Sequence, residues 1–320
     1  MQNRKFFPGA WYHIYSIAKD GGVLFYRTTD RLCFYTVLSI LARRYRINIL
    51  GLAIMFTHFH LMVKSIDLPQ LRLFMQQVLS TFSRLMNEDR NLDGARFKRP
   101  FGSAPKRTPK EQRSSLIYLF NNPVEKKLCS TAIDDRWTFL AYARQEYPFS
   151  NKLVKRQVRH TLRNACDTVD FEHRAGRYLR PSLLQRLFEP LTQTEQEQLA
   201  DYIIHKYACI DYQTAIALFG SFDKLLIATE ASAGKEFDVG EEYDPSSDAP
   251  YREMCDMAAR NGLFRDWKLL HLTPGERAKW ARNFRIATGA SEKQVRKFLH
   301  DTPPLPPKSS LQSPGLQQQR

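Results

Sequence analysis

The period of the apolar residues changes between two and about 3.6 along the first 125 residues, and this pattern most restricts the fold. Alternating stretches predict strands, and apolar residues three or four apart predict helices. The expected elements are a strand over 9–18, a helix over 30–46, strands over 47–56 and 59–66, a helix capped by Asp67, a strand-like stretch over 95–107 and a helix ending near Asn122. This order predicts an α+β fold with helices packed on one face of an antiparallel sheet.

The remainder of the chain has helical patterns, so we expect an all-α C-terminal region. Capping boxes are expected at Thr192/Glu195, Thr273/Glu276 and Ser291/Gln294, and simple caps at Asp211 and Ser221. Composition divides the chain into a first domain over 1–150, a helical region over 151–231, an acidic linker over 232–250, three helices over 251–300 and a disordered tail over 301–320.

Charge gives the first indication of a partner. The chain has 48 Lys and Arg against 33 Asp and Glu, a net charge of +15, and residues 1–150 alone contribute 23 basic and 11 acidic side chains. A positive field concentrated in one half suits a polyanion such as nucleic acid. No apolar run is long enough to span a bilayer, and the first residues lack the pattern of a secretory signal, so we expect a cytoplasmic protein without a membrane partner.

Two histidines lie two residues apart at the start of an expected strand. Because side chains alternate along a strand, His58 and His60 share one face while Phe59 points to the other. Such a pair can bind one metal ion, or it can be a hydrogen-bonded pair at the surface. The pattern alone leaves both interpretations open.

Tyr118 and Asn122 are four residues apart, which places them on one face of the expected helix. Pro123 disfavours helical geometry for the residue before it, so we expect Asn122 at the helix end, where its amide can reach a metal ion or a phosphate. A purely structural role at a helix end is the alternative.

Taken together, these residues resemble the single-tyrosine HUH transposases (histidine, hydrophobic residue, histidine), specifically the REP-associated tyrosine transposase branch. The resemblance covers about 145 residues and runs through Tyr12-His13-Ile14, His58-Phe59-His60-Leu61-Met62-Val63, Arg96-Phe97-Lys98, Tyr118, Asn122-Pro123-Val124 and, more loosely, the stretch from Arg136 to Ala143. It implies a ferredoxin-like HUH fold and a bacterial, nucleoid-associated protein. In place of the Met-Pro-Asn usual in the family, this chain has Met55-Phe56-Thr57 before His58.

The resemblance implies that His58, His60 and Asn122 bind Mg²⁺ or Mn²⁺ and that Tyr118 is the nucleophile. The implied reaction cuts and rejoins single-stranded or hairpin DNA through a 5′-phosphotyrosine bond, in a monomer or in a homodimer that exchanges its tyrosine helices. The basic side chains expected to hold the DNA backbone near the site are Lys98, Arg99, Lys106 and Arg107. A solvated basic loop is the other interpretation of this set.

Two features of the second half could also contact nucleic acid. Residues 151–164 would place Lys155 and Arg159 on one basic side of a helix, either tracking phosphates or facing solvent. The last two of the helices over 251–300 are joined by a short turn, as in a helix-turn-helix, although a plain helical packing module has the same pattern.

The leading hypothesis is therefore a metal-dependent DNA strand transferase of the transposase type. The first alternative is a DNA- or RNA-binding regulator that keeps the fold and the basic surface without catalysis. The second is an ordinary hydrolytic metal site, which would cleave DNA without a covalent intermediate.

Overall fold

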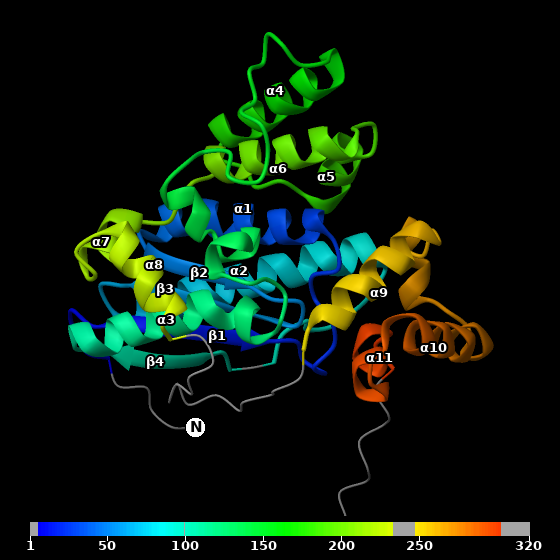
Figure 1. Cartoon of the computed structure of the whole chain (residues 1–320), viewed down its shortest axis with the longest axis horizontal. Helices are drawn as coiled ribbons and strands as arrows, with labels where there is room; N and C mark the ends of the chain where they lie inside the picture. The colour runs from blue at the N-terminus through cyan, green and yellow to red at the C-terminus, as the bar shows by residue number, and fades with distance from the viewer. Residues whose placement is uncertain (1–5, 99, 233–246, 302–320) are drawn as a thin grey trace, which may run out of the picture.

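The computed structural model describes residues 6–98, 100–232 and 247–301. These residues form a four-stranded antiparallel sheet with the strand order β2-β3-β1-β4 (Figure 1). The strands are β1 (Trp11–Ile17), β2 (Asn48–Ile54), β3 (His58–Lys64) and β4 (Gly102–Lys106). The order of elements from β1 to the third helix confirms the predicted alternation of strands and helices.

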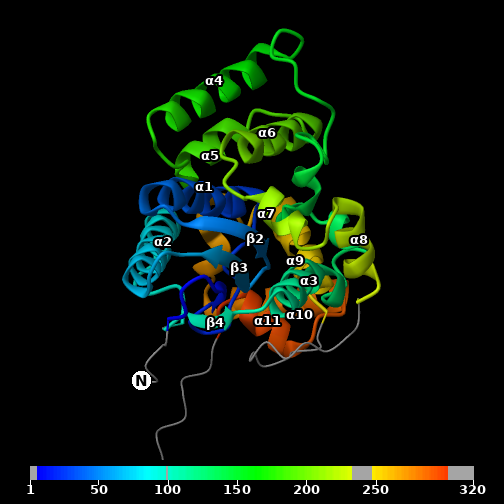
Figure 2. The ribbon, with the colours of Figure 1, turned by 90° about the vertical axis from the view of Figure 1, so that its left-hand side faces the viewer.

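Helices cover both faces of the sheet (Figure 2). α1 (Thr28–Tyr45) and α2 (Leu68–Arg90) share one apolar core with Leu61 and its neighbours on that face. α3 (Pro109–Glu125) packs on the opposite face with Met62. The prediction of helices on one face is therefore wrong, because consecutive residues of β3 point to opposite sides and both sides are buried.

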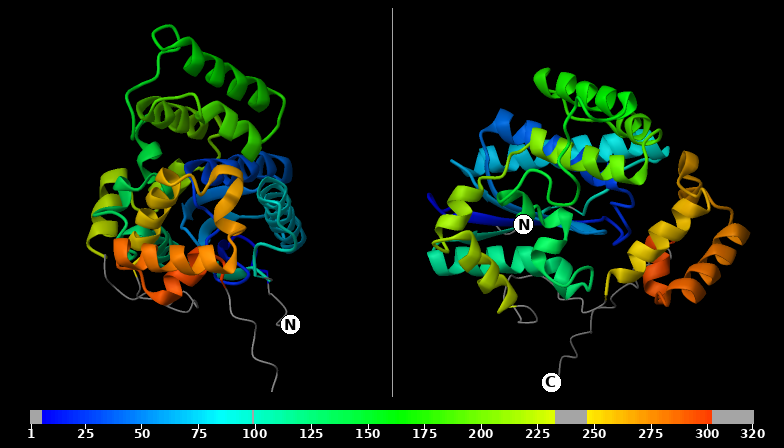
Figure 3. Two further views of the ribbon diagram at one scale, coloured as in Figure 1. Left: turned by 90° about the vertical axis from the view of Figure 1, so that its right-hand side faces the viewer. Right: turned by 45° about the horizontal axis from the view of Figure 1, so that its top comes forward.

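Three further helices stack on the outer side of α1 (Figures 1 and 3). The Tyr35 hydroxyl of α1 donates to the carbonyl of Ile204 at 3.3 Å, and the Ser39 hydroxyl donates to that of Tyr207 at 2.6 Å. Apolar residues of α1 and of these helices belong to one continuous core, which crosses the boundary predicted at residue 150. The helices are α4 (His160–Arg174), α5 (Pro181–Phe188) and α6 (Gln193–Lys206).

Two short helices follow α6: α7 (Tyr212–Ala217) packs against β2, and α8 (Phe222–Glu230) packs against α3. The Asn121 side chain in α3 donates to the carbonyl of Thr229 at 2.8 Å. Short 3₁₀ turns connect α3 to the stacked helices: η1 (Ala132–Asp134), η2 (Arg136–Thr138) and η3 (Leu140–Ala143).

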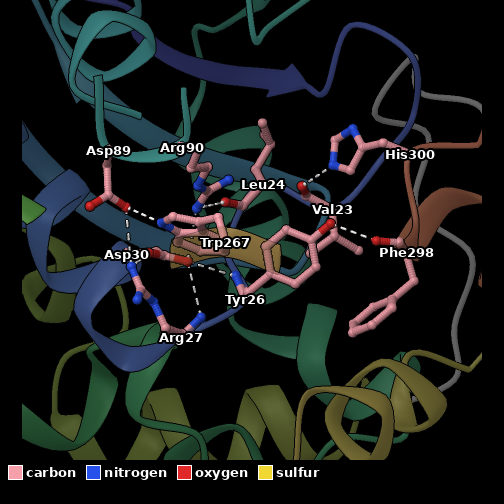
Figure 4. Close-up of polar contacts among 10 residues, drawn as sticks. All are labelled: Val23, Leu24, Tyr26, Arg27, Asp30, Asp89, Arg90, Trp267, Phe298 and His300. Carbon is pink, nitrogen blue, oxygen red and sulfur yellow. Dashed lines mark hydrogen bonds and ion pairs between the residues drawn. The ribbon is translucent and has the colours of Figure 1, made fainter. Parts of the chain in front are cut away.

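The last helices dock on the loop before α1 (Figures 3 and 4). The Tyr26 hydroxyl donates to the carbonyl of Phe298 at 2.6 Å, and the His300 ring contacts the carbonyl of Val23 at 2.9 Å. Their apolar core also includes Phe56 in the turn between β2 and β3. The elements are α9 (Ala249–Arg260), η4 (Arg265–Leu270), α10 (Pro274–Thr288) and α11 (Glu292–Phe298).

Two of the expected segments lie largely outside the described residues. For the acidic linker these are residues 233–246, and for the C-terminal tail they are residues 302–320. Every element described after β4 is helical. None of the described helices combines the length and the apolar character needed to cross a bilayer.

Candidate active site

The two histidines of β3 lie on the sheet face that α3 covers. Their ring centroids are 4.9 Å apart and the ring planes are perpendicular. Phe59 belongs to the core on the opposite face, as the alternation predicted. His60 is fully buried and His58 is half-buried, so the pair extends from the interior of the sheet toward its end.

A third histidine, His13 of β1, contacts this pair. In the antiparallel register His13 lies opposite Met62 and is therefore the diagonal neighbour of His60. Its Nε2 lies 3.2 Å from Nδ1 of His60, and both side chains are fully buried. Burial, with the charges of His60 and Lys106, lowers the pKa of His13 well below its ordinary value. His13 is thus a neutral imidazole near pH 7 and holds the His60 ring in one orientation.

The short turn before His58 is fixed by hydrogen bonds. The amide of Met55 donates to the carbonyl of His58 at 2.9 Å and closes a turn of two residues, Phe56 and Thr57. The carbonyl of Phe56 accepts from the amides of Leu24 and Phe25 at 2.8 and 3.1 Å. The Thr57 hydroxyl lies 3.0 Å from Nδ1 of His58. These contacts fix the backbone that leads into His58.

Tyr118 of α3 approaches the histidines of its own chain. The Tyr118 ring lies edge-on to that of His60, with centroids 5.4 Å apart, and 5.7 Å from that of His13. Tyr118 is half-buried, whereas its helical neighbours Leu119 and Phe120 lie in the core. Within one chain, the Tyr118 ring therefore lies beside the rings of His60 and His13.

Asn122 is buried one helical turn beyond Tyr118. Its side-chain nitrogen donates to the Tyr118 carbonyl at 3.0 Å, which turns the amide back along the helix. The prediction that the helix ends at Asn122 is wrong, because α3 continues through Pro123 to Glu125. A proline in the last turn of a helix removes one backbone hydrogen bond, and here the packed face of α3 outweighs that loss.

Glu125 is a further polar residue on this side of α3. It lies seven residues after Tyr118, so it shares a helix face with Tyr118 and Asn122. Its Oε1 atom is buried, and within the described residues it has no hydrogen-bond partner. Burial raises the pKa of Glu125, while Lys126 and His60 act electrostatically in the opposite direction. The sequence contains a signal for Glu125, because polar residues follow Tyr118 at the helical spacings of four and seven.

The four basic residues expected near the site have different surroundings. Lys106 of β4 lies opposite Trp11 in the register and acts electrostatically on His13. Lys98 is exposed, and its amide donates to the carbonyl of Ile17, which is the register partner of His58. The Arg107 guanidinium lies 3.9 Å from the centre of the Phe7 ring. Arg99 lies outside the described residues.

The basic helical stripe expected over residues 151–164 is wrong, because α4 begins only at His160. The nonhelical segment before it is fixed by ion pairs. Lys155 pairs with Asp167 at 2.8 Å and Asp170 at 2.6 Å, and Arg159 pairs with Glu195. These cations therefore neutralise carboxylates of this chain, and a DNA contact would compete with those pairs.

The donor atoms at the site restrict what it can bind. Within the described residues, no group of three or more His, Cys, Asp or Glu side chains is placed to hold a metal ion. A cation here would therefore need the amide oxygen of Asn122 in addition to His58 and His60. Nδ1 of each ring already has a neighbour, Thr57 for His58 and His13 for His60, so each ring would reach a metal through Nε2.

Comparisons with known proteins give one distant similarity. No protein-family model and no curated protein matches this chain. Among solved structures the chain is similar to one described as "Structure of the REP associates tyrosine transposase bound to a REP hairpin". The identity is 13%, the TM-score is 0.39, and the match covers 45% of this chain and 86% of the other. A TM-score of this size does not establish a common fold, so function must be inferred from the residues of this chain.

Proposed function

We propose that this chain is a DNA strand transferase in which Tyr118 attacks a phosphodiester of single-stranded or hairpin DNA. One observation carries the proposal: the Tyr118 ring lies 5.4 Å from the ring of His60 within the same chain. The βαββαβ order, with α1 and α2 on one face of the sheet, also supports the ferredoxin-like arrangement implied by the resemblance. Because Tyr118 approaches histidines of its own chain, the site does not require an exchange of helices between two chains.

The residues that would hold a divalent ion are His58, His60 and Asn122. Two imidazoles and one amide oxygen form a mixed, partly open site that leaves coordination positions for phosphate oxygens, and we assign Mg²⁺ or Mn²⁺ to it. When bound, such an ion would polarise the scissile phosphate and neutralise the charge that develops on it. The contacts of Thr57 and His13 with the two Nδ1 atoms support this assignment, because metal-binding histidines are commonly oriented through their second nitrogen.

The proposed reaction keeps the number of phosphodiester bonds constant. The Tyr118 hydroxyl oxygen forms a bond to phosphorus and loses its proton, while the bond from phosphorus to the 3′-oxygen breaks and that oxygen takes up a proton. The product is a 5′-phosphotyrosine and a free 3′-hydroxyl, and rejoining reverses the same step. No ATP is consumed, because the energy of the phosphodiester is retained in the bond to Tyr118.

The substrate class follows from charge and access. The site needs a phosphate that can bend toward a half-buried tyrosine, which a single strand or the base of a hairpin allows more readily than a duplex. Lys98 and Lys106 are the basic side chains that β1 and its neighbours bring toward the histidines, and we assign them to the DNA backbone.

The test is a search for a covalent adduct. Purified protein is incubated with Mn²⁺ and a labelled DNA hairpin that carries single-stranded flanks, then denatured and separated by electrophoresis. The wild type should give a slowly migrating labelled protein, and Tyr118→Phe should give none. The matched control is Tyr15→Phe, because Tyr15 lies opposite His60 in the register and its ring is 6.2 Å from that of His13.

Three outcomes would contradict the proposal. A Tyr118→Phe protein that still forms the adduct would show that Tyr118 is not the nucleophile. Cleavage without any adduct would favour a hydrolytic metal site. Tight binding without cleavage by the wild type would favour the non-catalytic regulator.

A further inference from the structure

A cleft of about 870 Å³ lies at the N-terminal end of α1. Its walls come from the start of α1, the turn between β2 and β3, the 3₁₀ turns after α3, α5, the start of α6, and α9 with the loop that follows it. We call it the α1 cleft. Two of its lining residues are close in sequence to the candidate active site: Phe56 lies two residues before His58, and Leu128 lies three residues after Glu125.

Arg31 lines the α1 cleft and has no counter-ion among the described residues. Only 7% of its surface is exposed, and its Nε atom is fully buried without a hydrogen-bond partner. Its guanidinium lies between two aromatic rings, 4.6 Å from the centre of Phe56 and 5.4 Å from that of Trp137. A buried cation without an anion is costly, so a ligand that supplies the anion would be strongly favoured here.

The carboxylates that act electrostatically on Arg31 are already engaged elsewhere. Asp30 pairs with Arg27 and Arg90, and Figure 4 shows these three residues together. Asp135 accepts a hydrogen bond from the Trp137 amide at 2.8 Å, and burial raises the pKa of its carboxyl group. Neither aspartate is within ion-pair distance of Arg31 in the described part of the chain.

The other charged groups of the α1 cleft do not cancel the preference of Arg31 for an anion. Thr28 and Thr29 line it with the first turn of an 18-residue helix, whose amides and dipole favour an anion. The other acidic lining residues are exposed and screened by solvent, whereas Arg31 acts from a buried position. These residues are Asp134, Glu189 and Asp256, and the exposed cations Arg252 and Arg265 line the cleft with them.

The walls of the α1 cleft also provide aromatic surface. Phe149 and Phe264 line it together with Phe56 and Trp137. Aromatic side chains stack on nucleobases, and a guanidinium and helix amides bind phosphate. A phosphate attached to a planar base, which is a nucleotide, satisfies both parts of the surface.

We propose that the α1 cleft binds one nucleotide of a single strand that flanks the phosphate attacked by Tyr118. The phosphate contacts Arg31 and the first turn of α1, and the base stacks on the aromatic wall. The flanking position rests on the proposed function, whereas the binding of a strand nucleotide does not. The cleft would thus hold the strand beside the histidines and fix which phosphate is presented.

The experiment measures binding without cleavage. Fluorescence anisotropy of a labelled mixed-sequence single-stranded 12-mer is followed at several salt concentrations, in the Tyr118→Phe background and without metal. Arg31→Met should weaken binding about tenfold or more. It should also reduce the slope of the logarithm of the binding constant against the logarithm of the salt concentration by about the amount that one phosphate contact contributes. The control is Arg44→Met in the last turn of the same helix, which removes the same charge from an exposed position and should change the affinity less than about twofold.

Thermal unfolding separates a binding role from a structural one. Arg31→Met should unfold at the same temperature as the parent or at a higher one, because it removes a buried charge without a partner. If Arg31→Met fails to fold, the exposed Arg252→Met replaces it, and it should weaken 12-mer binding about threefold or more.

Two results would overturn the proposal. One is 12-mer binding that is unchanged in both Arg31→Met and Arg252→Met. The other combines two observations: the four deoxynucleoside monophosphates raise the unfolding temperature, and 12-mer binding does not depend on Arg31. The cleft would then be a site for free nucleotides and not for a strand. All these binding and unfolding measurements use Tyr118→Phe proteins, which lack the proposed nucleophile. Their interpretation is therefore independent of whether the adduct experiment succeeds.

Discussion

At the scale of single residues, the candidate site depends on two side chains that touch no substrate. His13 contacts Nδ1 of His60, and Thr57 contacts Nδ1 of His58. A ring held at one nitrogen presents the other in a fixed direction, so under the proposed function these residues would position the rings for a bound ion. The Thr57 hydroxyl lies 3.0 Å from Nδ1 of His58, which is hydrogen-bond distance.

We therefore predict that loss of either contact weakens metal binding. His13→Leu and Thr57→Val should each lower the affinity for Mn²⁺ by about 10- to 100-fold, measured by electron paramagnetic resonance without DNA. His13→Gln should recover part of the affinity, because an amide can still hydrogen-bond to His60. The control is Ser16→Ala, which alters the same strand on its opposite face. Unchanged Mn²⁺ affinity in both variants would contradict the positioning role.

His300 predicts a dependence of stability on pH. Burial lowers its pKa to about 4, with Arg90 and Arg96 acting in the same direction and the Val23 carbonyl and Asp20 opposing it. The unfolded chain has the ordinary value near 6.5, so it binds the proton first as the pH falls. Stability is complete above about pH 6.5 and decreases by at most about 3 kcal/mol as the pH falls toward 4.

The variant His300→Gln keeps a donor for the Val23 carbonyl but does not titrate. Urea unfolding at pH 7 and pH 5 should show a smaller difference for this variant than for the wild type. An equal difference in the two proteins would show that other groups cause the pH dependence.

At the scale of elements, α1 and α2 are joined through a buried ion pair (Figure 4). Asp30 at the start of α1 lies 2.9 Å from Arg90 at the end of α2, and both are almost fully buried. Burial opposes the ionisation of Asp30, but Arg90, Arg27 and two backbone amides outweigh it and hold its pKa below the ordinary value. The carboxylate is therefore charged in the folded protein and joins the start of α1 to the end of α2.

Asp30→Asn should lower the free energy of unfolding by about 3–5 kcal/mol, because it leaves Arg90 buried without its charge partner. The stability that the wild-type carboxylate contributes is present above its unfolded pKa near 3.9 and is lost in stronger acid, so the variant should lack that part of the acid dependence. The control is Glu88→Gln, which breaks the exposed pairs with Arg84 and Arg180 and should cost less than about 1 kcal/mol. Urea unfolding measures both, and equal losses would contradict this account.

The sequence predicted those features of the elements that depend on neighbouring residues. The Asp67 side chain caps α2, and the boxes that begin at Thr192, Thr273 and Ser291 all form. A cap joins a side chain to an amide two or three residues away, so the local sequence contains both partners. The basic stripe before α4 failed because Lys155 finds its carboxylates in α4, 12 and 15 residues along the chain.

The site was predictable in part for the same reason. Tyr118 and Asn122 are related by helix spacing, and His58 and His60 by strand alternation. The contact of His13 with His60 joins residues 47 positions apart and depends on the register of two strands. No local pattern contains that register. A residue in the α1 cleft such as Arg31 likewise acquires its surroundings only when segments far apart in the sequence meet.

At the scale of the whole molecule, three helical groups complete surfaces that the sheet and its own helices leave apolar. α4 to α6 stack on α1, α7 covers β2, α8 covers α3, and the last helices cover the turn before His58 (Figures 1 and 2). The site-bearing part of the chain is therefore built against each of the later regions. This arrangement differs from a catalytic domain with independent domains attached to it.

We predict that residues 1–150 expressed alone do not fold cooperatively. In the whole chain the outer side of α1 is buried, and Tyr35, Thr36 and Ser39 hydrogen-bond to residues beyond position 175. Exposing that surface removes apolar burial and buried hydrogen bonds, and a domain is stable by only about 5–15 kcal/mol in total. Near-ultraviolet circular dichroism and urea unfolding should show weak tertiary signals and no sigmoidal transition. The control is a chain of residues 1–301, which keeps every described contact and should unfold like the full protein. A sigmoidal transition in the 1–150 fragment would contradict the prediction and show that the sheet with its three helices is an independent domain.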